Sequence, residues 1–397
     1  MGLNDTVSAE RIHIGFFGMR NAGKSSLVNA ITNQELSVVS NVKGTTTDPV
    51  KKAMELLPLG PVLIIDTPGL DDEGELGEKR ITKAKQILSQ TDIGILVVDS
   101  AVGLTNEDKE LILAFKERKL PYIIAYTKAD LLEAKKKLNE NEIYVSSKTK
   151  SGINEIKELI GKFAKGSLNT KHIVSDIISE NDIVILVTPI DESAPKGRLI
   201  LPQQQVLREL LDAHCTGVVC QPEELKRTIS MLSKKPRLVI TDSQVFDKAS
   251  SLTPDDIPLT SFSILFARYK GNLDELIKGA KALGNIKSGD NILICEGCTH
   301  HRQCNDIGTV KIPRLIEKFT GVKPNYSFTS GGEFPEDLGG ISLIVHCGGC
   351  MLNEKEMRSR IEKAKEQNIP IINYGILIAH TNKILKRALE PFDNISI

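Results

Sequence analysis

The chain has no tryptophan, and aromatic residues make up only 4% of it. Proteins that bind single-stranded nucleic acid stack the bases on aromatic side chains, so a platform of that kind is not expected. An excess of charge of one sign is lacking as well, because 51 basic residues balance 51 acidic ones. A formal net charge of zero gives no bulk attraction to nucleic acid or to an anionic membrane, so neither is expected as a partner.

Long apolar runs are also missing from the sequence. The longest, such as 93–98 and 183–187, have the length of a strand and fall far short of the roughly 20 residues that a membrane-spanning helix needs. The first ten residues are polar and lack the apolar core of a secretory signal. These features predict a soluble, cytoplasmic protein. In that reducing compartment seven cysteines, five of them between positions 295 and 350, favour metal or redox chemistry over disulfides.

A chain of 397 residues is too long for one core, and its alternating strand-like and helical patterns predict an α/β fold with mostly parallel sheets. We expect three domains: a Ras-like G domain with a phosphate loop at 1–170, followed by two smaller α/β domains at 171–275 and 276–397. Strands are expected in the first domain at 13–18, 62–66, 94–99, 122–127 and 142–146, in the second at 182–188, 217–220, 237–241 and 261–266, and in the third at 291–295, 341–346 and 369–374.

A phosphate-binding loop is the first motif along the chain. Residues 18–25 read Gly-Met-Arg-Asn-Ala-Gly-Lys-Ser and match the pattern G-x-x-x-x-G-K-[ST], between an apolar run and a helical one. Glycines let backbone N–H groups converge on phosphates, and the helix N-terminus adds a favourable dipole. The Lys24 ammonium is expected at the β- and γ-phosphates and the Ser25 hydroxyl at Mg²⁺. The residues expected to bind nucleotide here are Gly18, Asn21, Ala22, Gly23, Lys24, Ser25 and Ser26.

Two further motifs follow the ends of later strands. Residues 66–69 read Asp-Thr-Pro-Gly, and we expect Asp66 to hold magnesium through water while the Gly69 N–H senses the γ-phosphate. Residues 127–130 read Thr-Lys-Ala-Asp, and the Asp130 carboxylate can accept two hydrogens from the edge of guanine, which adenine does not offer. The three motifs in this order predict a GTP site with Mg²⁺.

The three motifs resemble those of the Era and TrmE branch of the translation-factor-related GTPases, over about residues 10–165. The resemblance implies a first switch at 44–48 in which Thr46 closes on Mg²⁺. It also implies guanine contacts from Thr127, Lys128 and Asp130 and from a last loop of Ser146, Ser147 and Lys148. Thr127 stands where that family usually has asparagine, which predicts a weaker guanine contact with specificity kept by Asp130.

The mechanism that this resemblance implies is slow GTP hydrolysis. Gly69 is followed by Leu70, so the glutamine that orients the attacking water in Ras-type sites is absent. Asn21 matches the asparagine that binds a potassium ion in the TrmE branch, which implies K⁺ in place of an arginine finger. The alternative is that Asn21 only caps backbone groups of the loop. The residues expected to act in hydrolysis are Lys24, Thr46, Asp66 and Gly69.

Cysteines and histidines gather after two apolar runs in the last third of the chain. One segment carries Cys295, Cys298, His300 and Cys304, and the other reads His346-Cys347-Gly348-Gly349-Cys350. Thiolates select zinc or iron–sulfur clusters, and glycines beside Cys347 allow N–H groups to approach its sulfur. Two sites remain open from the residues alone. One is zinc on Cys295, Cys298, Cys347 and Cys350, and the other is a 4Fe-4S cluster on Cys298, Cys347 and Cys350 with an exchangeable fourth position.

The pattern Cys298-x-His300 followed by His346-Cys347-x-x-Cys350 is similar to the CxH…HCxxC signature of the HydF family, the GTPases that mature FeFe-hydrogenase. Together with the G domain, this resemblance spans the whole chain. It implies a dimerisation domain at 171–275 and a cluster-binding domain at 276–397. It also implies a 4Fe-4S cluster on the three cysteines, with His300 or His346 as fourth ligand or hydrogen-bonding neighbour. Cys295 and Cys304 are expected to pack in the structure, although either could ligate.

This resemblance implies a scaffold or carrier that receives the two-iron subcluster precursor of the H-cluster and hands it to apo FeFe-hydrogenase. The implied partners are a second copy or more of this chain, the radical-SAM hydrogenase maturases and apo-hydrogenase. GTP binding is expected to act as a switch rather than as the source of assembly chemistry. The alternative is a ribosome- or tRNA-associated GTPase with a structural zinc domain, against which the neutral charge and the few aromatic residues count.

Overall fold

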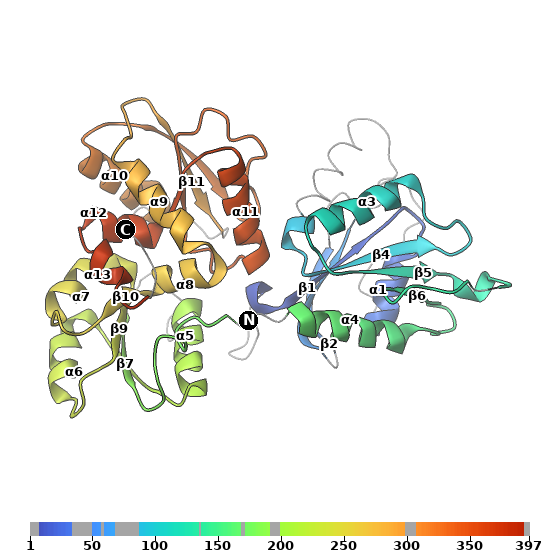
Figure 1. The fold of residues 1–397 in the computed structure, drawn as a ribbon, viewed down its shortest axis with the longest axis horizontal. Helices are drawn as coiled ribbons and strands as arrows, with labels where there is room; N and C mark the ends of the chain where they lie inside the picture. Colours follow the sequence, from blue (N-terminus) through green and yellow to red (C-terminus); the bar gives the residue numbers. More distant parts are fainter. Residues whose placement is uncertain are drawn as a thin grey trace. The chain divides into compact units, whose positions relative to one another are not determined.

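The computed structural model describes residues 8–33, 50–56, 59–67, 87–134, 136–167, 171–190, 199–297 and 307–392 (Figure 1). The chain divides into two compact units, Met1–Asn169 and Thr170–Ile397. The first contains one β-sheet and the second contains two, each covered by helices, which confirms the predicted α/β class and the G domain at the N-terminus. Among the described helices, none has the length and apolar character needed to cross a bilayer.

The described part of the first unit contains a six-stranded sheet in the order β2-β3-β1-β4-β5-β6, and among these described strands only the β2–β3 pair is antiparallel. Parallel strands covered on both faces are nearly continuous apolar runs, as in Ile93–Asp99. Its described elements are β1 (Ile12–Phe17), α1 (Lys24–Thr32), β2 (Val50–Leu56), β3 (Gly60–Asp66), β4 (Ile93–Asp99), α3 (Asn106–Glu117), β5 (Tyr122–Thr127), β6 (Glu142–Tyr144) and α4 (Ile153–Ser167).

The second unit contains two four-stranded parallel sheets, in the orders β10-β9-β7-β8 and β12-β11-β13-β14. The first half comprises β7 (Ile183–Val187), α5 (Leu201–Asp212), β8 (Thr216–Cys220), α6 (Leu225–Met231), β9 (Leu238–Thr241), α7 (Phe246–Leu252), β10 (Leu259–Ser261), α8 (Phe262–Lys270) and α9 (Leu273–Leu283). The second half comprises β11 (Asn291–Glu296), α10 (Ile312–Thr320), β12 (Asn325–Ser330), β13 (Leu343–His346), α11 (Glu354–Glu366), β14 (Ile371–Asn373), α12 (Tyr374–Thr381) and α13 (Leu385–Leu389).

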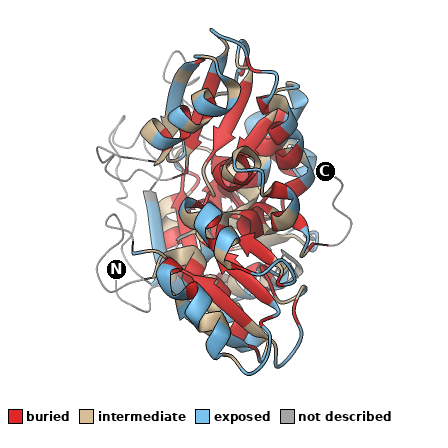
Figure 2. Cartoon of the chain, turned by 90° about the vertical axis from the view of Figure 1, so that its left-hand side faces the viewer, coloured by how far each residue is buried: buried red, intermediate tan, exposed pale blue. Residues whose placement is uncertain are grey.

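One continuous hydrophobic core joins the two sheets of the second unit. Buried residues concentrate on the strands and on the helix faces that cover them (Figure 2). Helix α8 packs against α5, α11 and α12, so it contacts helices from both halves of this unit. Any site at the ends of β11 and β13 therefore rests on a core to which the first half also contributes.

The strand predicted at 261–266 is wrong. Strand β10 ends at Ser261, and α8 begins at Phe262 because the Ser261 hydroxyl accepts the Ile264 N–H and caps the helix. Most of α8 is buried, so its apolar run shows no helical period, and periodicity alone does not separate a short buried helix from a strand. Sequence reasoning also missed β2 and β12, which are edge strands with few or no buried side chains.

Candidate functional site

The phosphate loop lies between the end of β1 and the start of α1, as the motif predicts. Gly18 has φ 136° and Gly23 has φ 89°, both in the region that favours glycine, and a Cβ on Gly18 would lie 2.2 Å from the Val97 carbonyl oxygen. The Lys24 ammonium donates to the carbonyl oxygens of Gly18 at 2.8 Å and Met19 at 2.6 Å. The cation is therefore held in the loop, where the phosphates of a nucleotide would take over from these carbonyls.

The phosphate loop contacts the motif at 66–69 through Ser25, the residue after Lys24. The Ser25 hydroxyl donates to a carboxylate oxygen of Asp66 at 3.0 Å. Thr67 closes the end of β3 onto β1, because its hydroxyl donates to the Phe16 carbonyl at 2.6 Å. A hydroxyl and a carboxylate at one point are hard oxygen ligands of the kind that Mg²⁺ prefers. The expected partners Thr46 and Gly69 lie outside the described residues.

A cleft of about 810 Å³ opens beside the loop. Its lining includes residues of the phosphate loop, of 127–130 and of the 146–148 loop, together with Asn29 of α1 and Asn33 just after it, which sequence reasoning missed. The lining residues from the predicted set are Gly23, Ser26, Thr127, Lys128, Asp130, Ser147 and Lys148. The parallel strands β1 and β5 deliver their loops to the same edge of the sheet, which is why motifs separated by about a hundred residues face one cleft.

Asp130 lines this cleft, and a hydrogen bond fixes its carboxylate. The Ser146 hydroxyl donates to its carboxylate at 2.6 Å, and this hydrogen bond is the main reason that the pKa of Asp130 lies below its ordinary value. The carboxylate is therefore ionised and an acceptor at neutral pH. Lys128 is in the left-handed region with φ 55°, and its ammonium pairs with Asp99 at 2.6 Å. Asp99 at the end of β4 is a contributor that the motifs did not reveal.

Thr127 lines the cleft, and its hydroxyl is directed at the backbone of the phosphate loop. Its side chain is buried, with only 2% of the residue exposed. The hydroxyl lies 2.5 Å from the carbonyl oxygen of Ala22 and 3.0 Å from that of Val98. Thr127 at the end of β5 thus contacts both β4 and the phosphate loop. Its hydroxyl therefore ties the phosphate loop to the segment that carries Asp130.

Asn21 lies at the tip of the phosphate loop. It is exposed and has φ 58°, a left-handed conformation that asparagine tolerates better than most residues. The residue therefore lies at the surface of the phosphate loop.

The cysteine turn follows β13 in the second unit. Strands β11 and β13 are parallel neighbours in which Cys295 pairs with His346, so their cysteine-rich ends lie side by side. The Cys347 sulfur accepts the N–H of Gly297 at 3.0 Å and that of Gly349 at 3.4 Å. Gly349 has φ 62°, which turns the chain back toward Cys350. Backbone N–H groups aimed at a sulfur stabilise its thiolate, and such bonds help to set the potential of iron–sulfur centres.

The remaining cysteines of this region divide by their surroundings. Cys295 is fully buried, and burial raises the pKa of its thiol to about 11, so it packs in the core as a neutral thiol. Burial raises the pKa of Cys350 as well, the nearby Cys347 adds to this, and the charge of Lys270 opposes it. Cys298, His300 and Cys304 lie outside the described residues. Within the described ranges, His, Cys, Asp and Glu residues form no group of three that could hold a metal ion.

Both ring nitrogens of His346 have partners. Nδ1 lies 2.8 Å from the Cys347 carbonyl oxygen, and Nε2 lies 3.0 Å from Nη1 of Arg360. Because a guanidinium only donates, the network assigns Nε2 as acceptor and places the ring proton on Nδ1. Arg360 also donates to the Gly331 carbonyl and pairs with Glu356, both at 2.8 Å. Sequence reasoning missed Arg360, which no motif marks.

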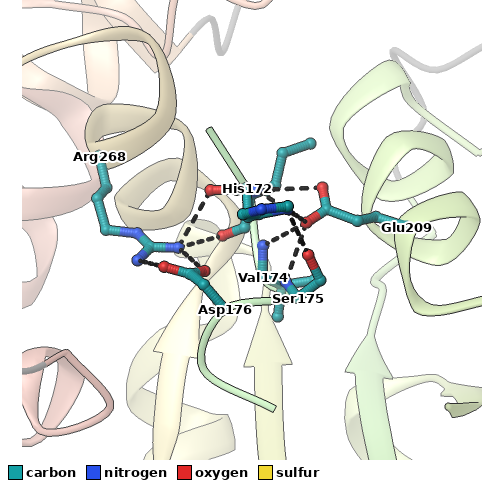
Figure 3. A network of polar contacts seen from close by, with 7 residues as sticks. His172, Val174, Ser175, Asp176, Glu209 and Arg268 are labelled. Atoms are coloured by element: carbon teal, nitrogen blue, oxygen red, sulfur yellow. Dashed lines mark hydrogen bonds and ion pairs between the residues drawn. The ribbon is translucent and has the colours of Figure 1, made fainter. Parts of the chain in front are cut away.

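A second polar network fixes the start of the second unit (Figure 3). The Glu209 carboxylate accepts the N–H groups of Ile173, Val174 and Ser175. Arg268 binds the Asp176 carboxylate with two nitrogens at 2.7 Å each. His172 uses Nδ1 both toward the Ser175 hydroxyl at 2.8 Å and toward Glu209 at 4.0 Å. A catalytic triad needs the two ring nitrogens on different partners, so this network is an anchor for the backbone.

Three family models match the chain. The one described as "Hydrogen maturase F tetramerization domain" covers residues 274–391, and "Hydrogen maturase F dimerization domain" covers 173–271. The third, described as "50S ribosome-binding GTPase", covers 13–128. The two consecutive maturase models together account for most of the second unit, and the GTPase model accounts for most of the first.

Two similar curated proteins each match less than half of this chain. The tRNA modification GTPase MnmE of Nitrosomonas europaea is 33% identical over 165 residues, which is 40% of this chain and 36% of that protein. MnmE of Legionella pneumophila strain Paris is 36% identical over 157 residues, 38% of this chain and 34% of that protein. The chain thus spans about a third of the length of these curated relatives. The solved structure of Aquifex aeolicus Era bound to GDP·AlF4⁻ is 18% identical with a TM-score of 0.35, covering 53% of this chain and 92% of that one.

Proposed function

The chain belongs to the hydrogen maturase F family, and on that premise we propose that it is a GTPase that carries the two-iron subcluster precursor of the H-cluster to FeFe-hydrogenase. Its first unit is a P-loop GTPase domain, and the matched dimerization and tetramerization domains support a homo-oligomer. The observation that carries the proposal is the Cys347 turn, where two backbone N–H groups point at one sulfur beside a second cysteine.

The nucleotide proposal is GTP hydrolysis in the cleft of the first unit. Asp130 accepts two hydrogens from the guanine edge, held in place by Ser146. Lys24 exchanges its bonds to loop carbonyls for the β- and γ-phosphate oxygens. Ser25 and Thr46 bind Mg²⁺, Asp66 holds it through water, and the Gly69 N–H contacts the γ-phosphate. Magnesium, when bound, neutralises charge that builds up on the phosphate oxygens. Asn21 binds K⁺, which serves in place of an arginine finger.

The donor set of the second unit fits a 4Fe-4S cluster held by Cys347 and Cys350, with Cys298 as the third proposed ligand. Cys295 lies outside the cysteine and histidine pattern and is fully buried within strand β11, so we assign it to the core rather than to the cluster or to a zinc site. Both ring nitrogens of His346 are engaged in hydrogen bonds, which favours a role as hydrogen-bonding neighbour of the cluster over a role as its ligand. Of the two histidines, His300 then remains the candidate for the fourth ligand. The cluster, when bound, supplies an iron with an exchangeable position at which the two-iron cargo can attach.

Iron content tests the cluster. Protein purified without oxygen should be brown and hold roughly four iron atoms per chain, as expected for a 4Fe-4S centre. Cys347→Ser and Cys350→Ser should each lose iron, while Cys215→Ser, which changes a buried cysteine just before β8, should keep it. Colourless protein with one zinc per chain, or unchanged iron in both turn variants, would refute the cluster.

Cargo delivery is tested separately. The chain, loaded by the radical-SAM maturases, should activate apo FeFe-hydrogenase, and the Cys347→Ser variant should not. An intact cluster without activation would remove the carrier role and leave the GTPase and the cluster in place.

The second candidate is a GTPase that acts on the ribosome or on tRNA, with zinc in its last domain. It is favoured by the names of the matched GTPase model and of the MnmE relatives, which concern the ribosome and tRNA. The GTPase model covers residues 13–128 and the two MnmE relatives match 40% and 38% of the chain, whereas the maturase models cover residues 173–271 and 274–391. Association with ribosomal particles at physiological salt, together with zinc in place of iron, would favour this candidate.

The domain roles follow from the same premise. We assign dimerisation to 171–275 and cluster binding to 276–397, in a cytoplasmic protein. Strand β8 is the edge strand of its sheet, and Val219 on it is 43% exposed. The backbone groups on the outer side of an edge strand can pair with a strand of a second copy, and we call this edge the β8 seam. Sedimentation of a Val219→Lys variant at a lower mass than the wild type would support that seam.

A further inference from the structure

Lys270 is a buried cation beneath the cysteine turn. It is the last residue of α8, and only 3% of it is exposed. Its ammonium donates to the carbonyl oxygens of Gly349 at 3.3 Å, Cys350 at 3.1 Å and Leu352 at 2.9 Å. The same ammonium lies 5.6 Å from the centre of the Phe266 ring. One side chain therefore gathers three carbonyls of a single turn.

Three carbonyls directed at one ammonium define the turn's backbone. An ammonium carries three N–H donors, and hydrogen bonds from a charged donor are stronger than neutral ones. The Leu352 N–H closes the same turn from within by donating to the Gly349 carbonyl at 3.0 Å. The Gly349 N–H, which belongs to the preceding peptide group, donates to the Cys347 sulfur at 3.4 Å. The lysine thus fixes the backbone that directly follows this N–H group and carries Cys350.

The lysine comes from outside the segment that carries the cysteines. Residue 270 falls in the match to the dimerization domain, which ends at 271, whereas the turn falls in the match to the tetramerization domain, which starts at 274. The end of α8 is packed tightly on α11, since a Cβ on Gly271 would lie 3.1 Å from the Ile361 side chain. No feature of the cysteine pattern points to position 270, because the contact joins residues about 80 positions apart.

We propose that Lys270 is a positioning residue of the cysteine turn, which fixes the backbone of 349–352 for ligation and favours the reduced state of the cluster bound there. The second part rests on the proposed function, and the first part does not. A thiolate-ligated cluster becomes more negative when it is reduced. A buried positive charge beside it therefore stabilises the reduced state, and net charge and hydrogen bonding are among the factors that set such potentials.

Two substitutions separate positioning from charge. Lys270→Met removes the charge and the donors at similar length, whereas Lys270→Gln removes the charge and keeps an N–H donor. Lys278→Met is the matched control, because it removes a lysine charge from the neighbouring helix α9, where Lys278 is exposed and paired with Glu275. Circular dichroism and thermal melting of each apo protein show which variants are folded. Where Lys270→Met does not fold, Lys270→Gln decides both parts.

Hydrogen–deuterium exchange of the peptide over 347–352 in the apo protein tests positioning. Lys270→Met should exchange about tenfold faster or more, since one charge-assisted hydrogen bond is worth about that factor in an opening equilibrium. Lys270→Gln should lie between it and the wild type, and Lys278→Met should match the wild type. Unchanged exchange in Lys270→Met, or in Lys270→Gln where it stands alone, overturns the positioning role.

Redox titration followed by electron paramagnetic resonance tests the charge. Both Lys270 variants should hold a cluster with a more negative midpoint potential than the wild type, and Lys278→Met should leave the potential in place. An unshifted potential in both Lys270 variants overturns this part. If the wild type itself holds no iron, the cluster proposal fails, while the exchange comparison still decides whether Lys270 positions the turn.

Discussion

Replacing Arg360 tests the strongest buried electrostatic contact near the cysteine turn. Arg360 and Glu356 form an ion pair at 2.8 Å, with side chains only 3% and 9% exposed. Arg360→Met keeps a long side chain but removes the donors to Glu356, His346 and the Gly331 carbonyl. Breaking a buried pair from one side leaves an uncompensated charge and costs about 3–5 kcal/mol. We expect the second unit to lose stability by that amount.

Replacing both Arg360 and Glu356 tests whether the loss of stability comes from the unpaired charge. In Arg360→Met with Glu356→Leu the orphaned carboxylate is gone, and replacing both members of a buried pair by apolar groups is often close to neutral. What remains is a His346 ring nitrogen and a Gly331 carbonyl without their donor, worth about 1–3 kcal/mol each if they stay dry. The double variant should therefore be no less stable than Arg360→Met alone, and the two single effects should not add.

Native-state hydrogen exchange of α11 is the assay, because a chain with two compact units need not unfold in one transition. Arg358→Met is the control, since Arg358 lies on the same helix with 51% of its side chain exposed and pairs with Glu354. Exposed pairs contribute about 0–1 kcal/mol. A loss below about 1 kcal/mol for Arg360→Met, or singles that add in the double variant, would refute the reasoning.

The remaining predictions concern the nucleotide site and the anchor of the second unit. Asp130→Asn should weaken GTP binding at least about tenfold and improve binding of xanthosine triphosphate, because the Asn amide donates a hydrogen bond where guanine also donates one. Titration with fluorescent analogues measures both affinities, and an unchanged preference for guanine would contradict the prediction. Thr127→Val removes the hydroxyl that joins the Ala22 and Val98 carbonyls, so the first unit should lose about 1–3 kcal/mol in urea unfolding, while Thr149→Val at the surface should lose little. GTP turnover should be faster in potassium than in sodium, and Asn21→Ala should abolish the difference; equal wild-type rates would remove K⁺ from the site. Burial raises the pKa of Asp176, but hydrogen bonds and charge from Arg268 outweigh it, so the pKa lies below its ordinary value of 3.8. A depressed pKa stabilises the folded state above the unfolded value and loses that effect as the pH falls through the folded one, so Asp176→Asn should lower the urea midpoint at pH 7 by an amount that shrinks below about pH 4.

The nucleotide site could be predicted because its information is local. Each motif is a short run at the end of an apolar strand, and parallel strands bring their ends to one edge, so the order of motifs implies the site. What the motifs did not contain are contacts between distant positions. The hydroxyl of Thr127 meets the Ala22 carbonyl across 105 positions, and Lys128 meets Asp99 across 29. The weaker guanine contact predicted for Thr127 stays a prediction, but its hydroxyl is directed at the backbone of the phosphate loop.

Strands were predictable where they form a distinct apolar run and not where they lack one. Central strands such as β4 are apolar up to their last residue and were placed within a residue or two. The edge strands β2 and β12 have few or no buried side chains, so no apolar pattern marks them. The start of α8 was misplaced because Ser261 ends a strand and caps a helix at once. Competition between a buried strand and a buried helix is settled by packing, which a single sequence does not display.

The cysteine turn shows why a ligand pattern alone does not describe this site. Lys270 reaches the turn from α8, and Arg360 reaches it from α11 through His346, and both cations are only 3% exposed. Neither helix contributes a cysteine, yet together they fix the carbonyls of Cys347, Gly349, Cys350 and Leu352 directly or through one imidazole. The Glu356 carboxylate balances the charge of Arg360, whereas burial raises the pKa of Cys350 and the charge of Lys270 opposes that rise. A chain that kept every cysteine but replaced Lys270 with an apolar residue would therefore keep the pattern and lose a charge that favours a thiolate at Cys350.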